Sequence, residues 1–178
     1  MRTSTCAAAL AALVLVSVAL PVAGQWIGFN PSETVPSAET FTVELVLDTE
    51  GVAVMGADVL FSFDPAVVRL DAVTEGDWFT TAPEPWFFWA DAAESLPGIV
   101  HVTGSVMTTG RGGAGALAVL HFTAQAAGFS PLDFQAVSLR SPLNAPVPHT
   151  HSVGDRIVIE EAIGTEARSF GDLKALWR

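Results

Sequence analysis

Apolar and polar residues alternate along several short segments of this chain, and turn-forming residues separate one segment from the next. The first such segment carries apolar side chains at every second position, namely Phe41, Val43, Leu45 and Leu47. A period of two matches a β-strand, in which successive side chains point to opposite faces of a sheet. The alternation therefore predicts strands with one buried face and one solvated face.

Similar segments follow along most of the chain. The pattern predicts further strands at 58–63, 68–72, 86–90, 99–106, 116–126, 132–139 and 156–160. Stretches rich in proline or glycine interrupt them at 83–85, 96–98, 110–115 and 128–131. Short strands with regular turn signals and hardly any helical period are typical of an all-β sandwich. We expect one such domain over residues 25–161.

The inward positions of these strands predict one core between two sheets. Its members are Val43, Leu45, Leu47, Val59, Phe61, Phe63, Leu70, Val100, Val102, Leu120, Phe122, Phe134, Ile157 and Ile159. A domain of this size buries enough surface in one core to be stable without disulfides.

Residues 1–24 have the layout of a secretory signal peptide. Arg2 gives a positive start, residues 6–20 are almost wholly apolar, and small residues follow Pro21. The alternative is a membrane anchor, but the run is shorter than the ~20 apolar residues that a span needs. We expect cleavage after Gly24 and export to the cell envelope or the exterior. Cleavage would also remove Cys6, the only cysteine.

Residues 162–178 form a separate C-terminal tail. Ser169 and Asp172 could cap a helical turn in this tail. The apolar face of that turn would carry Phe170, Leu173, Leu176 and Trp177. A frayed terminus, a small helix docked on the sandwich and a short sorting tag all remain open for this segment.

The charge balance of the chain is strongly acidic. The net charge is -11, and removal of Arg2 with the signal peptide leaves 7 basic against 19 acidic side chains. Nucleic acids and anionic membranes attract clustered Lys and Arg, which this chain lacks. The composition favours a soluble exported protein or a partner with a basic face.

The motifs of common enzymes are missing from the sequence. No G-x-S-x-G elbow occurs, no cysteine remains after cleavage, and the glycine run at 110–115 lacks the Lys-Ser/Thr ending of a phosphate loop. Only His149 and His151, which we expect to lie in a proline-rich loop, have metal-ligand spacing, and no further ligand lies near them in the sequence. We expect no catalytic residue, no metal and no cofactor.

The aromatic run Trp86-Phe87-Phe88-Trp89 is the most unusual local feature. On a strand, it would place two rings on each face, so that two are buried and two are exposed. Exposed rings there could bind a sugar or a protein. A carbohydrate-binding module is therefore an alternative if Trp78, Trp86 and Trp89 line one flat surface. A purely structural extracellular sandwich is another.

Strand alternation also predicts which side chains face solvent. Because Val59, Phe61 and Phe63 point inward, Asp58, Leu60 and Ser62 must point outward. His101 and Thr103 likewise point away from their apolar neighbours in 99–106. An acceptor, an apolar centre and a titratable ring on one face resemble a protein-recognition surface more than a sugar platform.

The order of these segments resembles that of a cohesin domain. The matching segments are 40–48, 55–65 with its Phe63-Asp64-Pro65 turn, 67–76, 112–124 and 155–161, which follow one another in family order. The resemblance covers roughly residues 26–161. It implies a nine-stranded jelly-roll or immunoglobulin-like sandwich that binds dockerin modules, related in fold to carbohydrate-binding modules.

The resemblance also implies a partner-binding face. In the family, the outer face of one sheet receives the partner, with a polar pair on the third strand and the strand 99–106 beside it. The aspartate of that pair matches Asp58, whereas its asparagine falls at Gly56, which has no side chain to donate or accept a hydrogen bond. We expect a non-catalytic module that binds a dockerin-like or other protein partner through Asp58, Leu60, Ser62, Trp89, His101 and Thr103.

Overall fold

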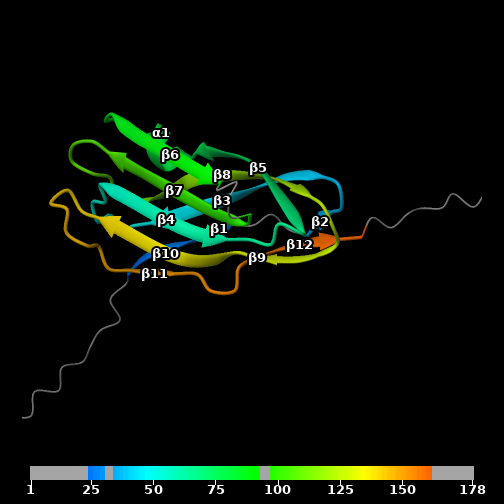
Figure 1. The fold of residues 1–178 in the computed structure, drawn as a ribbon. Coiled ribbons are helices and arrows are strands. Elements are labelled where there is room, and N and C mark those ends of the chain that lie inside the picture. The colour runs from blue at the N-terminus through cyan, green and yellow to red at the C-terminus, as the bar shows by residue number, and fades with distance from the viewer. Residues whose placement is uncertain (1–23, 31–33, 93–96, 162–178) are drawn as a thin grey trace, which may run out of the picture.

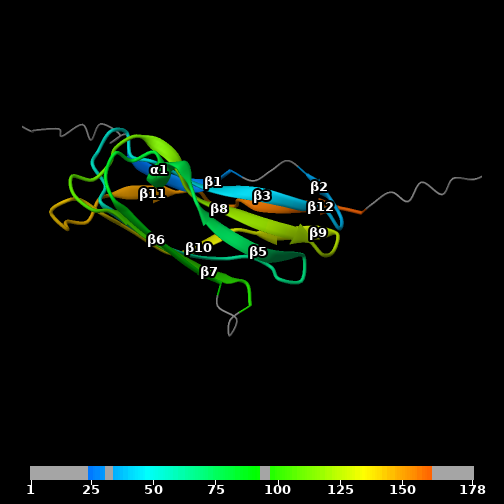
Figure 2. The same ribbon diagram turned by 90° about the horizontal axis from the view of Figure 1, so that it is seen from above.

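A computed structural model describes residues 24–30, 34–92 and 97–161, and the predicted signal peptide and C-terminal tail lie outside these residues apart from Gly24. The described residues form twelve strands and one short helix. Figure 1 shows the strands lying in layers, and Figure 2 shows the two main layers from above. The prediction of an all-β sandwich is confirmed.

The strands belong to three sheets. The five-stranded sheet has the order β11 (His149–His151), β1 (Gln25–Asn30), β3 (Thr40–Asp48), β8 (Ala114–Ala124), β5 (Val68–Glu75). The four-stranded sheet has the order β10 (Asp133–Arg140), β4 (Gly56–Ser62), β7 (Ile99–Val106), β6 (Trp86–Ala92). A small sheet of β2 (Val35–Pro36), β12 (Arg156–Glu160) and β9 (Gly128–Pro131) lies at one end (Figure 1).

The core lies between the two larger sheets, as the alternation predicts. Eleven of the fourteen predicted core residues are fully buried, and the other three, Phe63, Leu70 and Phe134, are partly buried against them. Aromatic rings join the layers: Phe29 of β1 meets Phe61 of β4 edge-on, with ring centroids 5.0 Å apart. Such contacts add to the apolar burial that stabilises the sandwich.

Two predicted loops are wrong, because both segments are strands. The turn expected at 128–131 is β9, which pairs antiparallel with β12 and ends at Pro131. Proline is tolerated there because β9 is an edge strand. The loop expected around His149 and His151 is β11, which pairs parallel with β1. The described residues form twelve strands where the resemblance implies nine, and two of the twelve, β2 and β11, have only two and three residues.

A one-turn helix, α1 (Asp77–Thr80), follows β5 and closes one side of the core. Its carboxylate Asp77 Oδ1 accepts a hydrogen bond from the backbone N–H of Ala116 at 2.7 Å. Trp78 and Phe79 of this helix are buried, and their rings meet edge-on. The guanidinium of Arg111 lies 5.7 Å from the centre of the Trp78 ring. The helix therefore anchors two large apolar side chains in the core.

Candidate functional site

Strand β4 lies in the middle of the four-stranded sheet, between β10 and β7. Its pairing with β7 places Asp58 opposite Thr103 and Leu60 opposite His101. This pairing confirms the expected position of the strand 99–106 beside the third strand. The side chains of Asp58, Leu60, His101 and Thr103 therefore lie on one outer face, because Ala57, Val59 and Phe61 face the core.

Polar contacts connect the outward side chains of β4 to its neighbours. His101 Nε2 lies 3.2 Å from Asp58 Oδ1, and both side chains remain partly exposed, so this pair is accessible to a partner. Gln135 Nε2 donates to Ser62 Oγ at 3.1 Å, and Thr103 Oγ1 donates to the backbone oxygen of Ala57 at 3.3 Å. Leu60 is half-buried between these polar groups.

Trp89 extends the same face onto β6. The strand pairing sets Trp89 opposite Thr103, and the Trp89 ring meets the His101 ring edge-on at 5.4 Å. The structure thus brings all six predicted residues together on one sheet face. We call this surface the recognition face, defined by Asp58, Leu60, Ser62, Trp89, His101 and Thr103.

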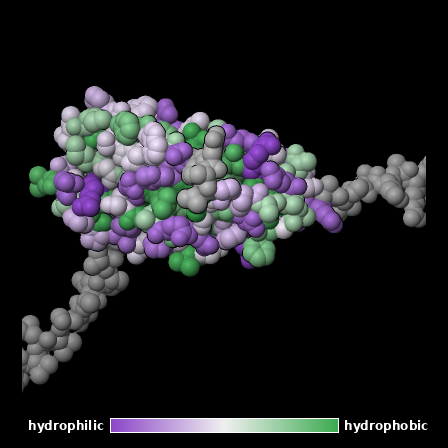
Figure 3. Space-filling model, viewed as in Figure 1, coloured by the Kyte–Doolittle hydropathy of each residue, from purple (hydrophilic) through white to green (hydrophobic). Residues whose placement is uncertain are grey.

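Other residues on this face were missed by the sequence reasoning. Arg140 of β10 lies opposite Gly56, Phe87 of β6 lies opposite Ser105, and Asp91 lies opposite His101. Phe87 could have been found, since it stands two residues before Trp89 and so shares its face. Arg140 could not, because its place depends on a strand pairing between distant segments. Figure 3 shows polar and apolar side chains interspersed over this side of the molecule.

A shallow hollow of about 200 Å³ lies at one end of the recognition face, over Gly56. Asp58, Phe87 and Arg140 are among the side chains that line it. The missing side chain at Gly56 leaves this space open, since a Cβ there would meet no atom closer than 3.8 Å. The departure from the cohesin pattern is therefore also a change in the shape of the surface.

The flat tryptophan surface that would favour sugar binding does not form. Trp78 is 0% exposed, so it cannot contact a ligand at the surface. Trp86 and Trp89 are three residues apart on one strand, so their side chains leave the backbone on opposite faces of the sheet. The expectation of two buried and two exposed rings in this run is also wrong, because Trp86, Phe87 and Trp89 are 36%, 48% and 43% exposed. The reason is that β6 is an edge strand.

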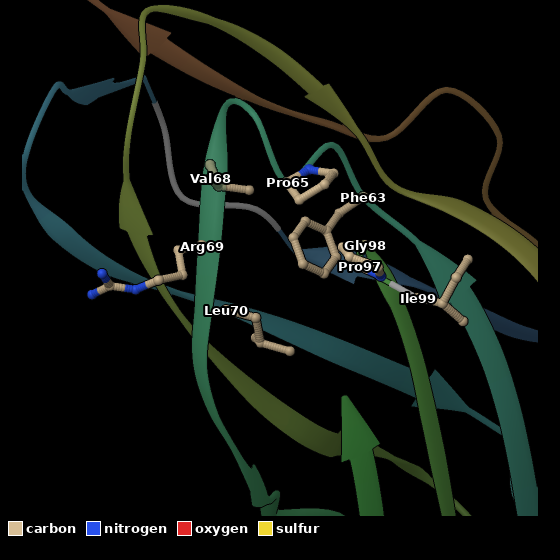
Figure 4. Close-up of a pocket in the computed structure, with 8 residues that line it drawn as sticks. All are labelled: Phe63, Pro65, Val68, Arg69, Leu70, Pro97, Gly98 and Ile99. Atoms are coloured by element: carbon tan, nitrogen blue, oxygen red, sulfur yellow. The ribbon is translucent and has the colours of Figure 1, made fainter. Parts of the chain in front are cut away.

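A second, apolar pocket of about 180 Å³ lies between the turn after β4, strand β5 and the start of β7. Figure 4 shows Phe63, Pro65 and Leu70 around it, with the Arg69 guanidinium pointing away. Arg69 is held outside by an ion pair with Asp71 at 2.7 Å. The side chains around this pocket therefore offer mainly apolar contact.

The histidine pair on β11 makes contacts within the protein. His149 Nδ1 lies 3.0 Å from the backbone oxygen of Val147, and the His151 ring meets the Phe134 ring at 5.5 Å. Among residues 24–30, 34–92 and 97–161, no group of three or more His, Cys, Asp or Glu side chains is placed to hold a metal ion.

Glu84 connects the segment before β6 to the loop after β7. Hydrogen bonds from Thr108 and Thr109 stabilise its carboxylate and lower the pKa of Glu84 to about 2.

No family model matches the chain, and no curated protein matches it. Solved structures do. The seventh ScaB type I cohesin from Pseudobacteroides cellulosolvens superposes with a TM-score of 0.64 at 14% identity, covering 82% of this chain and 98% of that one. A non-cellulosomal cohesin from the archaeon Archaeoglobus fulgidus gives 0.60 at 14% identity, over 82% and 96%. The cohesin–dockerin complex Coh-OlpC-Doc435 from Clostridium thermocellum gives 0.62 at 14%, over 78% and 95%.

The two packed sheets and their antiparallel pairings define a β-sandwich module that is built around one core. Within that class, the chain has a cohesin-like fold. Among the described residues, no helix is long and apolar enough to cross a bilayer.

Proposed function

We propose that this chain is a non-catalytic module that binds a dockerin-like protein through the recognition face. The observation that carries this proposal is the convergence of Asp58, Leu60, Trp89 and His101 on one sheet face of a cohesin-like fold. The face combines an accessible carboxylate–imidazole pair with an apolar centre and an exposed aromatic ring. Protein interfaces are similarly built from aromatic anchors within a polar surround.

Complexes of the structural neighbours support the kind of partner. The Clostridium thermocellum structure with the same fold is a cohesin bound to a dockerin. Polysaccharide is a weaker candidate, because the tryptophans do not form a flat platform. The partner should carry basic groups, since the chain is acidic and Asp58 and Asp91 both lie on the face.

Loss of the central contacts should abolish partner capture. We expect the Asp58→Ala, Leu60→Ala double variant to recover at least about tenfold less protein than wild type from the secreted proteins of the source organism, because it removes an acceptor and the apolar centre together. Quantitative mass spectrometry of the pull-down measures the difference.

A matched control lies on the opposite side of the sandwich. Glu44 of β3 and Val119 of β8 are likewise an acid and an apolar residue, and they lie opposite each other on the outer face of the five-stranded sheet. The Glu44→Ala, Val119→Ala variant should capture the same partners as wild type. Equal capture by both double variants, with both folded, would show that the recognition face is not the binding surface.

We further propose that the module is exported, with residues 1–24 removed as a signal peptide and residues 162–178 left as a tail beyond the binding domain at 25–161. The mature protein should begin at Gln25, because small residues precede it after Pro21. Intact-mass analysis of protein recovered from the medium or envelope measures this directly. A chain that retains Met1 in a membrane fraction would contradict the proposal.

A further inference from the structure

We infer that the hollow over Gly56 receives one neutral carboxamide side chain, Asn or Gln, from the protein partner, and that this hollow selects among partners. This inference rests on the proposed function, since it concerns one end of the recognition face.

The hollow is a feature of this chain's own sequence. Gly56 is an outward position of β4, flanked by Arg140 on β10 and Ser105 on β7. A Cβ at Gly56 would lie 3.8 Å from the backbone oxygen of Gly104 and 3.9 Å from Arg140 Cβ, which are ordinary contact distances. The fold therefore does not require glycine at this position, and a side chain would occupy space that is now open to a partner.

The charges around the hollow restrict what can enter it. Asp58 and Arg140 both line the hollow. The Asp58 carboxylate accepts hydrogen bonds and has His101 Nε2 at 3.2 Å from Oδ1, and the Arg140 guanidinium only donates them and has the backbone oxygen of Asn144 at 3.5 Å from Nη1. A side chain of either charge would be attracted by one of these two groups and repelled by the other. A carboxamide carries a donor and an acceptor on separate atoms without net charge, so it can bond to both.

The third wall of the hollow is aromatic. Phe87 is 48% exposed and lines the hollow from the β6 side. A planar amide can lie against such a ring while its polar atoms reach the charged groups. A purely apolar occupant would shield Asp58 and Arg140 from water and offer them no further hydrogen bond, which is costly.

A display experiment tests the inference. The probe is the dockerin of the Clostridium thermocellum complex, displayed on yeast and randomised at the residues that contact its cohesin. Selection with the wild-type chain should enrich Asn or Gln at one position. Clones with that residue should bind Gly56→Leu at least about tenfold more weakly than wild type. Replacing the enriched residue by Ala should remove the difference in affinity between wild type and Gly56→Leu, because substitutions of two residues in contact have non-additive effects.

Two controls keep the outcome readable. Val119→Leu places a leucine side chain on the opposite face and should bind like wild type. Gly56→Ser provides a smaller block should Gly56→Leu lose its thermal stability. Clones that need Asp58 and Leu60 but bind Gly56→Leu as tightly as wild type would contradict the inferred role of the hollow and leave the proposed function standing. Enrichment of a charged or apolar residue at the coupled position would have the same meaning. A selection in which no clone depends on Asp58 and Leu60 would contradict the proposed function itself.

Discussion

Replacing Phe61 by alanine is expected to lower the free energy of unfolding by about 3–5 kcal/mol. Phe61 is 0% exposed near the end of β4, and its ring meets Phe29 of the facing sheet. Truncation removes this apolar surface and leaves a cavity that neighbouring side chains cannot fill completely. Such a loss is a large fraction of the stability of an ordinary domain. Urea unfolding of the mature protein measures it.

Phe129 provides a matched control for the same substitution. It lies on the edge strand β9 with 64% of its surface exposed, so Phe129→Ala should cost less than about 1 kcal/mol. Equal losses for Phe61→Ala and Phe129→Ala would show that the core does not lie between the two sheets as described.

The substitution Gly76→Ala is expected to destabilise the domain by about 1–3 kcal/mol or more. A Cβ at Gly76 would lie 2.1 Å from the backbone oxygen of Ala116, so either β8 or the segment leading into α1 must move. The movement would disturb the Asp77 hydrogen bond to Ala116 and the burial of Trp78. The near-ultraviolet circular dichroism of tryptophan, followed during thermal unfolding, reports this change.

Gly56→Ala is the corresponding control, since a Cβ there meets only ordinary contacts. An alanine that fits without strain can stabilise by about 0.4–1 kcal/mol through the unfolded chain. If Gly76→Ala were as stable as Gly56→Ala, the close packing of the segment before α1 against β8 would be wrong.

Period-two alternation was sufficient to predict which side chains of the long strands face inward. It placed Val59 and Phe61 in the core and Asp58 and Leu60 outside, because side-chain direction in a strand is a local property. The strands β1, β2, β9 and β11 were not predicted from sequence. β2, β9 and β11 are short and contain or follow proline, and all four strands pair with a segment that is distant in the chain.

The candidate site likewise combines features that a single strand predicts with features that depend on pairing between distant segments. Resemblance to cohesins supplied the pairing of β4 with β7, from which the recognition face follows. The contact of Trp89 with His101 and the place of Arg140 depend on register between segments far apart in the chain. The hollow over Gly56 is lined by residues of four neighbouring strands, so no single segment could have predicted it.

Backbone hydrogen exchange of the module bound to its captured partner tests the central claim most directly. Binding through the recognition face should slow exchange in β4, β7 and β6, where a partner excludes water. It should leave β3, β8 and β5 of the five-stranded sheet unchanged. Protection confined to the five-stranded sheet, or absent from both sheets, would contradict the account.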